Sequence, residues 1–501
     1  MCLSNHTDSK VELPGKTPCL AAAHAQTADL KVPESKRIPF GWTAAGIGPG
    51  SGESLTLYWN GPLRNHPAWL RIAIALDVRE NVRLALRSAA TGVPIGEFDI
   101  RYASVFQLYQ VKLTGAQTEL VLKEGAVLSL IQGSEALWIF TGGPAEAPLL
   151  LPHLLPESAD SPDPWLQLPG NLASLSSVQA FGWQEGCVLD GLLELERAAG
   201  TGRFLGSVKA HLGMFFDQHG NLRYENPRSE PADGRVYGIE GTLPFAALAQ
   251  VDPAHPSMER AIRFWLSDAS DDGTIRDGTM LSAEGSYTIA YPMAVMAKAY
   301  DRHDLALLAI RQLEARQKLL TDGDVLYLRS HEDGSRSFRN WSRAYAWYLL
   351  GLARTLRELQ EFSSLPDADY NRIAALKSEL ARAAGVIMTY QSPAGLWPVY
   401  VDEPETGIET SGSAAIAAAL AIGVQLGVLD DQAGLAALRT RNALTDYLTP
   451  DGILYGVAQN NKDDGRLQRE GYRILSQMGT GLAAQLEAVL QQLPGLPGIR
   501  L

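Results

Sequence analysis

The second half of the chain repeats a pair of helices and a short turn, and this repeat constrains the fold more than any other feature. From about residue 185, apolar side chains recur at three- and four-residue spacing, as on one face of a helix. Between alternate helices comes a glycine turn followed by a short apolar or aromatic run, at 217–224, 272–278, 322–327, 394–397 and 451–455. The pattern predicts helices at 185–199, 202–216, 238–250, 257–267, 284–300, 303–319, 342–359, 367–390, 411–426, 431–447 and 471–492.

Repeated helix pairs with their turns on one rim are typical of helical repeat folds. Six such pairs closed in a ring form an (α/α)6 toroid barrel. The pattern supplies eleven helices, one fewer than a closed ring needs, so closure is an inference and an open helical solenoid is the alternative.

Residues 38–143 follow a different period. Apolar residues alternate or run over strand lengths at 55–59, 69–76, 82–86, 105–113, 118–122, 126–130 and 136–140, with Gly, Asn and Pro between them. Many short strands at this spacing indicate an antiparallel β-sandwich. Such a domain either buttresses its neighbour or binds sugar, and no exposed aromatic row favours sugar binding.

We therefore expect a mixed, mainly α fold with four parts. Residues 1–35 are predicted to be a flexible tail, 36–143 a β-sandwich, 144–180 a linker and 181–497 the barrel. The linker is rich in proline, which argues against helix interiors and central strands there.

Composition excludes several classes of function. The chain has 501 residues, a formal charge of −13 and no Lys/Arg-rich block, which disfavours nucleic acid as a partner. No stretch approaches the ~20 apolar residues of a membrane span. The N-terminus lacks the apolar core of a signal peptide, so we expect a cytoplasmic address, with the periplasm as the alternative. A small anionic substrate is still compatible with the negative net charge, because arginines near a binding site can outweigh the mean field within a Debye length of ~8 Å.

Cofactor and metal chemistry have no sequence support. The three cysteines, Cys2, Cys19 and Cys187, lack metal-ligand spacing, and the histidines show no HxH or HExxH pattern. No phosphate-binding loop or G-x-S-x-G motif is present. We predict no cofactor and no metal.

Two glutamates are the candidate catalytic residues. Glu240 lies in YGIEGTLPF and Glu284 in SAEGSY, each beside a glycine, close to an aromatic residue and at the start of an apolar helix. A carboxylate at a helix start can simply complement the macrodipole or cap the helix. Two carboxylates facing one cavity are also the usual equipment for acid/base work on a glycosidic bond.

The motif WSRAYAW contains Arg343, the candidate residue for binding the carboxylate of a substrate. Arg343 and Trp347 share a helix face, so the pair is either an arginine stacked in the core or a guanidinium fork beside a sugar platform. Glu409, Thr410 and Ser411 fit helix capping or ligand binding equally. The full set of predicted binding residues is Arg343, Trp347, Trp341, Tyr287, Arg329, Trp397, Glu409, Thr410, Ser411, Tyr472 and Arg473, with Arg339 as a further cationic candidate.

Two motifs resemble the unsaturated uronyl hydrolases of glycoside hydrolase families 88 and 105. WSRAYAW is similar to their W-x-R-G-N-G-W, and 395–413 is similar to their G-L-W…D-x-P…E-T-S-G/A-S block. The resemblance spans about residues 185–495. It implies an (α/α)6 barrel that releases a terminal uronic acid, with an aspartate as proton donor and the motif arginine on the sugar carboxylate.

The resemblance carries over residue by residue. Arg343 and Trp347 fall on the family's arginine and second tryptophan, Glu240 falls on an aspartate, and Glu284 lies within one residue of the proton donor. Both acids are glutamates here, and Ala-Tyr-Ala replaces Gly-Asn-Gly. The related family 154 has this barrel behind a β-domain and acts on saturated β-glucuronides.

We therefore expect an exo-acting glycosidase that releases a terminal uronic acid, saturated or 4,5-unsaturated, from oligosaccharides. The alternatives are a polysaccharide lyase acting by β-elimination and a non-catalytic sugar-binding protein. A homodimer is a candidate assembly.

Overall fold

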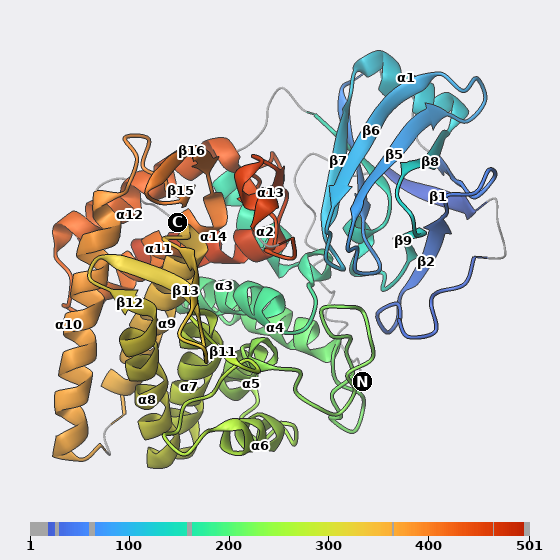
Figure 1. Cartoon of the computed structure of the whole chain (residues 1–501). Coiled ribbons are helices and arrows are strands. Elements are labelled where there is room, and N and C mark those ends of the chain that lie inside the picture. Colours follow the sequence, from blue (N-terminus) through green and yellow to red (C-terminus); the bar gives the residue numbers. More distant parts are fainter. Residues whose placement is uncertain are drawn as a thin grey trace, which may run out of the picture.

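The chain folds into a sheet-rich N-terminal part and a larger helical part (Figure 1). The computed structural model describes residues 19–25, 30–59, 66–157, 163–362, 365–463 and 465–494. The expected mainly helical architecture behind a sheet-rich region is confirmed.

The N-terminal part contains an eight-stranded antiparallel sheet in the order β6-β5-β8-β3-β1-β10-β4-β7. Its edge strands β6 and β7 also contact each other, so the sheet curls around its own apolar core. A second, two-stranded sheet pairs β2 with β9. The strands are β1 (Cys19–Ala25), β2 (Thr43–Ile47), β3 (Leu55–Trp59), β4 (Ala68–Ala73), β5 (Asn81–Ser88), β6 (Pro94–Arg101), β7 (Leu108–Leu113), β8 (Ala126–Gln132), β9 (Leu137–Gly142) and β10 (His153–Pro156).

The structure corrects two expectations in this part. The strand predicted at 118–122 is instead helix α1 (Gly115–Glu124), because Thr114 and Gln117 form a reciprocal capping box at its start. The predicted tail contains β1, which pairs with β3 and β10 inside the large sheet. The rest of the tail up to residue 29 lies outside the described residues.

Six helices of the second part contact one another in cyclic order. They are α3 (Trp183–Ala199), α5 (Pro244–Val251), α7 (Tyr291–Tyr300), α9 (Ser342–Gln360), α11 (Thr410–Gln425) and α14 (Gln477–Gln491). Each packs on the next, and α14 packs on α3, so the cycle of contacts closes. Nearly all residues of α9, α11 and α14 are buried, as expected for helices surrounded by others.

A second set of helices packs outside this cycle: α4 (Arg203–Gly213), α6 (Met258–Asp268), α8 (His303–Leu320), α10 (Asp367–Thr389) and α12 (Asp431–Leu444). Each is followed by one of the recurring turns, and several of these close small hairpin bridges, such as Phe216 with Leu222 and Leu448 with Leu454. The turns lead back to the next inner helix, which brings the starts of the inner helices to one end.

The predicted linker is more ordered than its prolines suggested. Helix α2 (Pro164–Ala173) includes Pro169 and packs against α14, α3 and α4, so it supplies the helix that the sequence count lacked. Strand β10 lies between β1 and β4, with a proline only at its end. Pro164 occupies the first turn of α2, where proline is tolerated, and Pro169 lies inside a helix that packing on α14, α3 and α4 stabilises.

The two parts share one hydrophobic cluster. Trp42, Phe106 and Phe140 of the N-terminal part belong to the same buried cluster as the helical core. Across this interface Arg71 of β4, 1% exposed, forms a bidentate ion pair with Asp451 at 2.5 and 2.9 Å. The interface is therefore a packed one rather than a loose tether.

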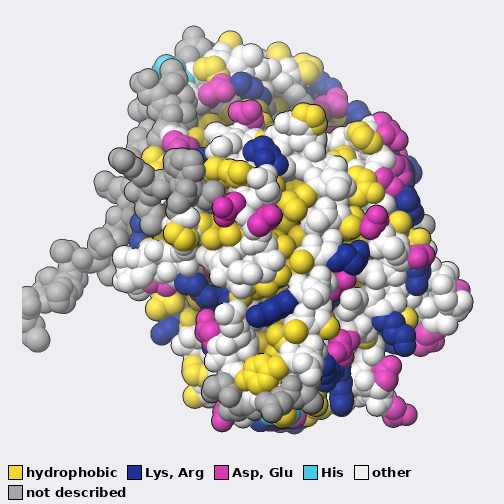
Figure 2. All heavy atoms as spheres, turned by 90° about the vertical axis from the view of Figure 1, so that its left-hand side faces the viewer, with side chains coloured by type: hydrophobic (Ala, Val, Ile, Leu, Met, Phe, Trp, Pro, Cys, Tyr) yellow, Lys and Arg dark blue, Asp and Glu magenta, His cyan; other side chains and the backbone are white. Residues whose placement is uncertain are grey.

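The outer surface is mixed in charge. Figure 2 shows the face where α10 and α12 lie, on which Lys and Arg are interspersed with Asp and Glu. None of the described helices is long and apolar enough to cross a bilayer.

The packing makes Gly351 of α9 a sensitive position. A Cβ there would overlap the main chain of Ser286 and Tyr287, whereas a Cβ at Gly385 of α10 meets nothing within 4 Å. We expect Gly351→Ala to lower the free energy of unfolding by about 1–3 kcal/mol. Gly385→Ala is the matched control and should be neutral or stabilising by up to about 1 kcal/mol. Urea unfolding measures both, and equal stability of the two variants would contradict this packing.

Candidate active site

A cavity of about 390 Å³ opens where the inner helices begin, against the N-terminal part. This volume lies within the usual range for small-ligand sites. Its wall includes five cationic residues, Arg79, Arg228, Arg329, Arg343 and Lys462, and three carboxylic acids, Glu240, Asp277 and Glu284. A chain with a formal charge of −13 thus gathers an excess of cations at one cavity.

The two predicted catalytic glutamates both line this cavity. Glu240 lies in the 3-10 turn η3 (Ile239–Thr242) just before α5, and Glu284 comes just before the π-helical turn η4 (Ser286–Ala290) that leads into α7. The Thr242 hydroxyl, in η3, donates hydrogen bonds to the carbonyls of Ile239 and Thr288. The hydrogen bond from Thr242 to the carbonyl of Thr288 joins η3 to η4 directly and so holds both glutamates at the same end of the helix cycle.

Burial sets the protonation of Glu240. Desolvation and then the negative charges of Glu284 and Asp277 raise the pKa of Glu240 to about 8, against the opposing pull of Arg329 and Lys462. At neutral pH this carboxyl group is therefore mostly protonated and can donate a proton. Desolvation also raises the pKa of Glu284, while the charge of Arg329 opposes that rise.

Arg329 reaches the cavity from strand β13 (Val325–His331). Its strand pairs with β11 (Met280–Ser282) in a register that sets Arg329 opposite Ser282, two residues before Glu284. Its guanidinium stacks on Phe338 at 5.2 Å and donates no hydrogen bond to any described residue. Its donors are therefore free for an anionic ligand.

A buried arginine fixes the segments that carry Asp277 and Glu284. Arg316 of α8 is fully buried and donates to the carbonyls of Ser282 (2.9 Å) and Ile275 (3.3 Å). Gly285 lies against this guanidinium, and a Cβ at that position would overlap it. Because Ser282 and Ile275 each lie two residues before an acid, Arg316 sets the place of both carboxylates.

Three tryptophans supply flat surfaces. Trp341, Trp347 and Trp183 line the cavity, and Trp183 meets Trp347 edge to face at 5.6 Å. The Arg343 guanidinium lies over the Trp341 ring at 4.7 Å and is 2% exposed. Burial lowers the pKa of Arg343, and the charges of Glu409 and Glu284 oppose this. The arginine stacks on tryptophan, as one interpretation of this block expected, and it also lines the cavity, as the other requires.

Of the predicted residues, Glu240, Glu284, Arg329, Trp341, Arg343 and Trp347 line the cavity together, and seven do not. Tyr287 lies below the cavity, where its ring stacks on Trp347 at 6.1 Å and its hydroxyl donates to the buried Asp190. Trp397 is fully buried and donates to the carbonyl of Ile387 at 2.8 Å. These two residues support the site or the core without reaching a ligand in the cavity.

The capping interpretation holds for the second motif. Glu409 caps α11, accepting from the amide of Gly412 and from Ser411, and Thr410 donates to the carbonyl of Tyr455 at 2.8 Å. These side chains are buried away from the cavity and contact protein only.

The remaining cationic and aromatic candidates stabilise loops. Arg473 donates to the carbonyls of Ile408 and Thr406, and Tyr472 donates to the carbonyl of Asp99 in β6. Arg339 pairs with Asp402 at the surface. The local sequence does not distinguish Arg339 and Arg473 from Arg329. Which arginine lines the cavity depends on which loops pack together in the folded chain.

The sequence argument missed several lining residues. Asp277 belongs to a turn that repeats along the chain and so resembled scaffold, while Tyr237 is the first residue of the Glu240 motif but was not proposed as a site residue. Asn460, Asn461 and Lys462 come from a loop with no motif, and Arg79, Ser104 and Val105 come from the N-terminal part. The described residues contain no cluster of three His, Cys, Asp or Glu that could hold a metal ion.

The model of Glycosyl Hydrolase Family 88 matches residues 285–485. The unsaturated rhamnogalacturonyl hydrolase YesR of Bacillus subtilis (strain 168) is 25% identical over 199 residues, covering 38% of this chain and 54% of that protein. The chain thus spans about half the length of this curated relative.

Solved structures show the same helical fold. A protein of Salmonella enterica serovar Paratyphi A, described as a possible member of glycoside hydrolase family 105, aligns with a TM-score of 0.56 at 15% identity, covering 66% of this chain and 93% of that one. A family 105 glycoside hydrolase of C. acetobutylicum aligns with a TM-score of 0.54 at 20% identity, covering 63% and 95%.

The comparisons confirm the resemblance to the uronyl hydrolase-like glycoside hydrolases of families 88 and 105. The family match begins at residue 285, so it includes Arg343 and Trp347 and stops just short of Glu284. The roles of the two glutamates therefore rest on geometry alone.

The negative charge of Asp277 contributes to the raised pKa of Glu240, and a substitution at Asp277 tests this contribution. Because that charge raises the pKa of Glu240, Asp277→Asn should lower it from about 8 toward the ordinary value. The titration of ¹³C-labelled glutamate side chains by NMR measures this in the free protein. Asp268→Asn, on α6 outside the cavity, is the control. An unchanged Glu240 titration would remove Asp277 from the electrostatics of the site.

Proposed function

We propose that this chain is an exo-acting glycoside hydrolase that releases a terminal uronic acid, a saturated β-glucuronide or a 4,5-unsaturated uronide, from oligosaccharides. The observation that carries the proposal is one cavity lined by Glu240, whose pKa is raised, by the further acids Asp277 and Glu284, and by the guanidinium groups of Arg329 and Arg343. Its helical part is then an (α/α)6 toroid, and its sheet-rich part a β-sandwich that includes the strands from β1 to β10.

Glu240 is the proposed general acid. Its raised pKa keeps the proton available at neutral pH, where it protonates the departing glycosidic oxygen, or C4 of an unsaturated uronide. Glu284 is the proposed base that activates water on the other side of the sugar, with the nearby charge of Arg329 favouring its ionised form.

Arg329 and Arg343 are the proposed readers of the sugar carboxylate. Both line the cavity, and each keeps guanidinium donors without a partner among the described residues. An arginine binds a carboxylate through two parallel hydrogen bonds, which selects a uronic acid over its neutral analogue. Trp347 and Trp341 offer faces on which the pyranose can stack.

Conservative substitution tests the acid and the base. Glu240→Gln and Glu284→Gln should each lower kcat by about 10²–10⁴, because a general acid or base contributes about that much. Glu259→Gln is the control, since its side chain is 57% exposed on α6. Thermal unfolding verifies the fold, and wild-type turnover in either variant would remove that residue from the mechanism.

A substrate panel tests the carboxylate selection and the alternatives. Aryl β-glucuronide, aryl β-galacturonide and an unsaturated uronyl disaccharide should include a substrate, and the matching aryl β-glucoside should be cleaved at least tenfold more slowly. Equal cleavage of the neutral glucoside contradicts the proposal. New conjugated double bonds formed from a saturated uronic acid polymer would indicate a lyase, and binding without any turnover a sugar-binding protein.

A further inference from the structure

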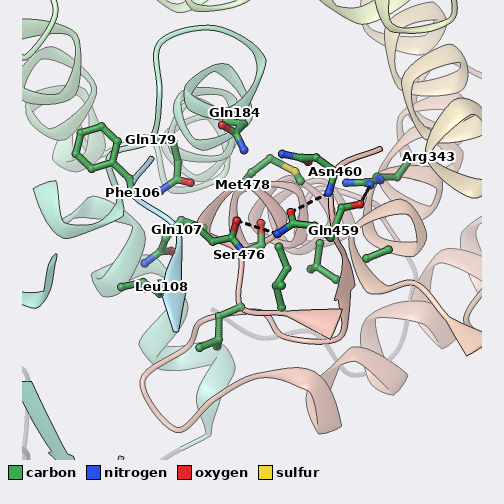
Figure 3. Close-up of a pocket in the computed structure, with 15 residues that line it drawn as sticks. Phe106, Gln107, Leu108, Gln179, Gln184, Arg343, Gln459, Asn460, Ser476 and Met478 are labelled. Atoms are coloured by element: carbon green, nitrogen blue, oxygen red, sulfur yellow. Dashed lines mark hydrogen bonds between the residues drawn. The ribbon is translucent and has the colours of Figure 1, made fainter. Parts of the chain in front are cut away.

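One wall of the cavity is a loop of the helical part that is held by the N-terminal part. Asn460, Asn461 and Lys462 of this loop line the cavity. The loop follows β17 (Val457–Ala458), and its other side lies against residues 101–107, between β6 and β7. A small polar cavity of about 10 Å³ lies at this contact, with Gln107, Gln459 and Arg343 in its wall (Figure 3).

Gln459 is the centre of this contact. Its side-chain amide donates to the carbonyl of Arg101 (2.7 Å) and to Gln107 Oε1 (3.2 Å), both in the N-terminal part. Its own Oε1 accepts from the amide of Asn460 at 2.8 Å. The residue is fully buried and every polar atom of its side chain is bonded, so its position is fixed.

The main chain of Gln459 in turn holds Arg343. The carbonyl of Gln459 accepts from Arg343 Nη2 at 2.6 Å (Figure 3). It also accepts from the side chain of Gln468. No described residue accepts a hydrogen bond from Nε or Nη1 of Arg343. The guanidinium is thus tied at Nη2, its Nε is buried without a partner, and Nη1 is left for a ligand.

Lys462 fastens the far end of the same loop. Its ammonium group donates to Asp77, to the carbonyl of Ala103 (3.3 Å) and to Ser104 Oγ (3.2 Å), all in the N-terminal part. All three hydrogens of the Lys462 ammonium group are therefore engaged in these bonds. The lysine joins the two parts of the chain rather than binding substrate. Asn460 adds a bond to Ser104 at 3.0 Å.

We propose that the N-terminal part is a functional component of the active site and that Gln459 is the positioning residue through which it orients Arg343 for a sugar carboxylate. The inference rests on the proposed function, because it names the determinant of uronide selection in that same site. It assigns the sheet-rich part a role that simple buttressing does not require.

The test variant is Gln459→Met, which keeps the length of the side chain and removes its hydrogen bonds. We expect KM for the aryl uronide to rise about tenfold or more, with kcat changed less than threefold and cleavage of the neutral aryl glycoside unchanged. Selection of uronide over neutral glycoside should therefore fall. A merely structural role would lower both activities together, and that result would overturn the proposal.

The matched control is Glu470→Gln. It removes the ion pair between Glu470 and Arg101, which joins the same two parts at 3.2 Å outside the cavity, and should leave uronide selection unchanged. If Glu470→Gln lowers selection as much as Gln459→Met does, general docking of the two parts is responsible and the proposal fails.

Two further measurements keep the result decisive. If Gln459→Met does not fold, Gln459→Glu serves in its place, since it keeps the acceptor for Asn460 and loses both donors to the N-terminal part. If the wild type cleaves no uronide, the proposed function fails, and calorimetric binding of glucuronate then decides. Weaker binding by the variant supports the positioning role, whereas equal or absent binding overturns it.

Discussion

The site depends on the cost of keeping carboxylic acids together out of water. Glu240, Asp277 and Glu284 share one cavity wall, and desolvation with mutual repulsion favours the protonated form of at least one. The fold tolerates this arrangement because the Thr242 bond joins the two glutamate-bearing turns and Arg316 ties the segments before Asp277 and Glu284.

The helix cycle explains why these turns meet. Each inner helix starts at the same end, so residues far apart in sequence, such as Glu240 and Arg343, reach one cavity. The N-terminal part closes the side of this cavity with Arg79, Ser104 and Val105.

Periodicity predicted most of the helical part, because a buried helix must repeat its apolar residues at the helical period. Prediction from periodicity failed where helix capping or tertiary packing outweighed the hydrophobic pattern. Residues 118–122 look like a strand by composition, yet the capping box at Thr114 starts a helix there. Helix α2 was missed because its prolines, at 164 and 169, argue against a helix while its packing on α14, α3 and α4 stabilises one.

The candidate site was predicted in part. Six of the proposed residues line the cavity. Five of them lie at or near the start of an inner helix, a position that motif and periodicity together indicate, whereas Arg329 reaches the cavity from strand β13. Glu409 and Ser411 also lie at the start of an inner helix, but there they take part in capping the helix. The sequence was compatible with both capping and ligand binding. Lys462, Arg79 and Asn460 could not be found from sequence, since they reach the cavity only through the contact between the two parts.

A crystal structure of the Glu240→Gln variant with a bound aryl β-glucuronide tests the account most directly. The account predicts the pyranose ring against Trp347 or Trp341, its carboxylate on Arg329 and Arg343, and its glycosidic oxygen within hydrogen-bond distance of residue 240. A sugar bound with its carboxylate in solvent, or bound outside this cavity, would contradict it.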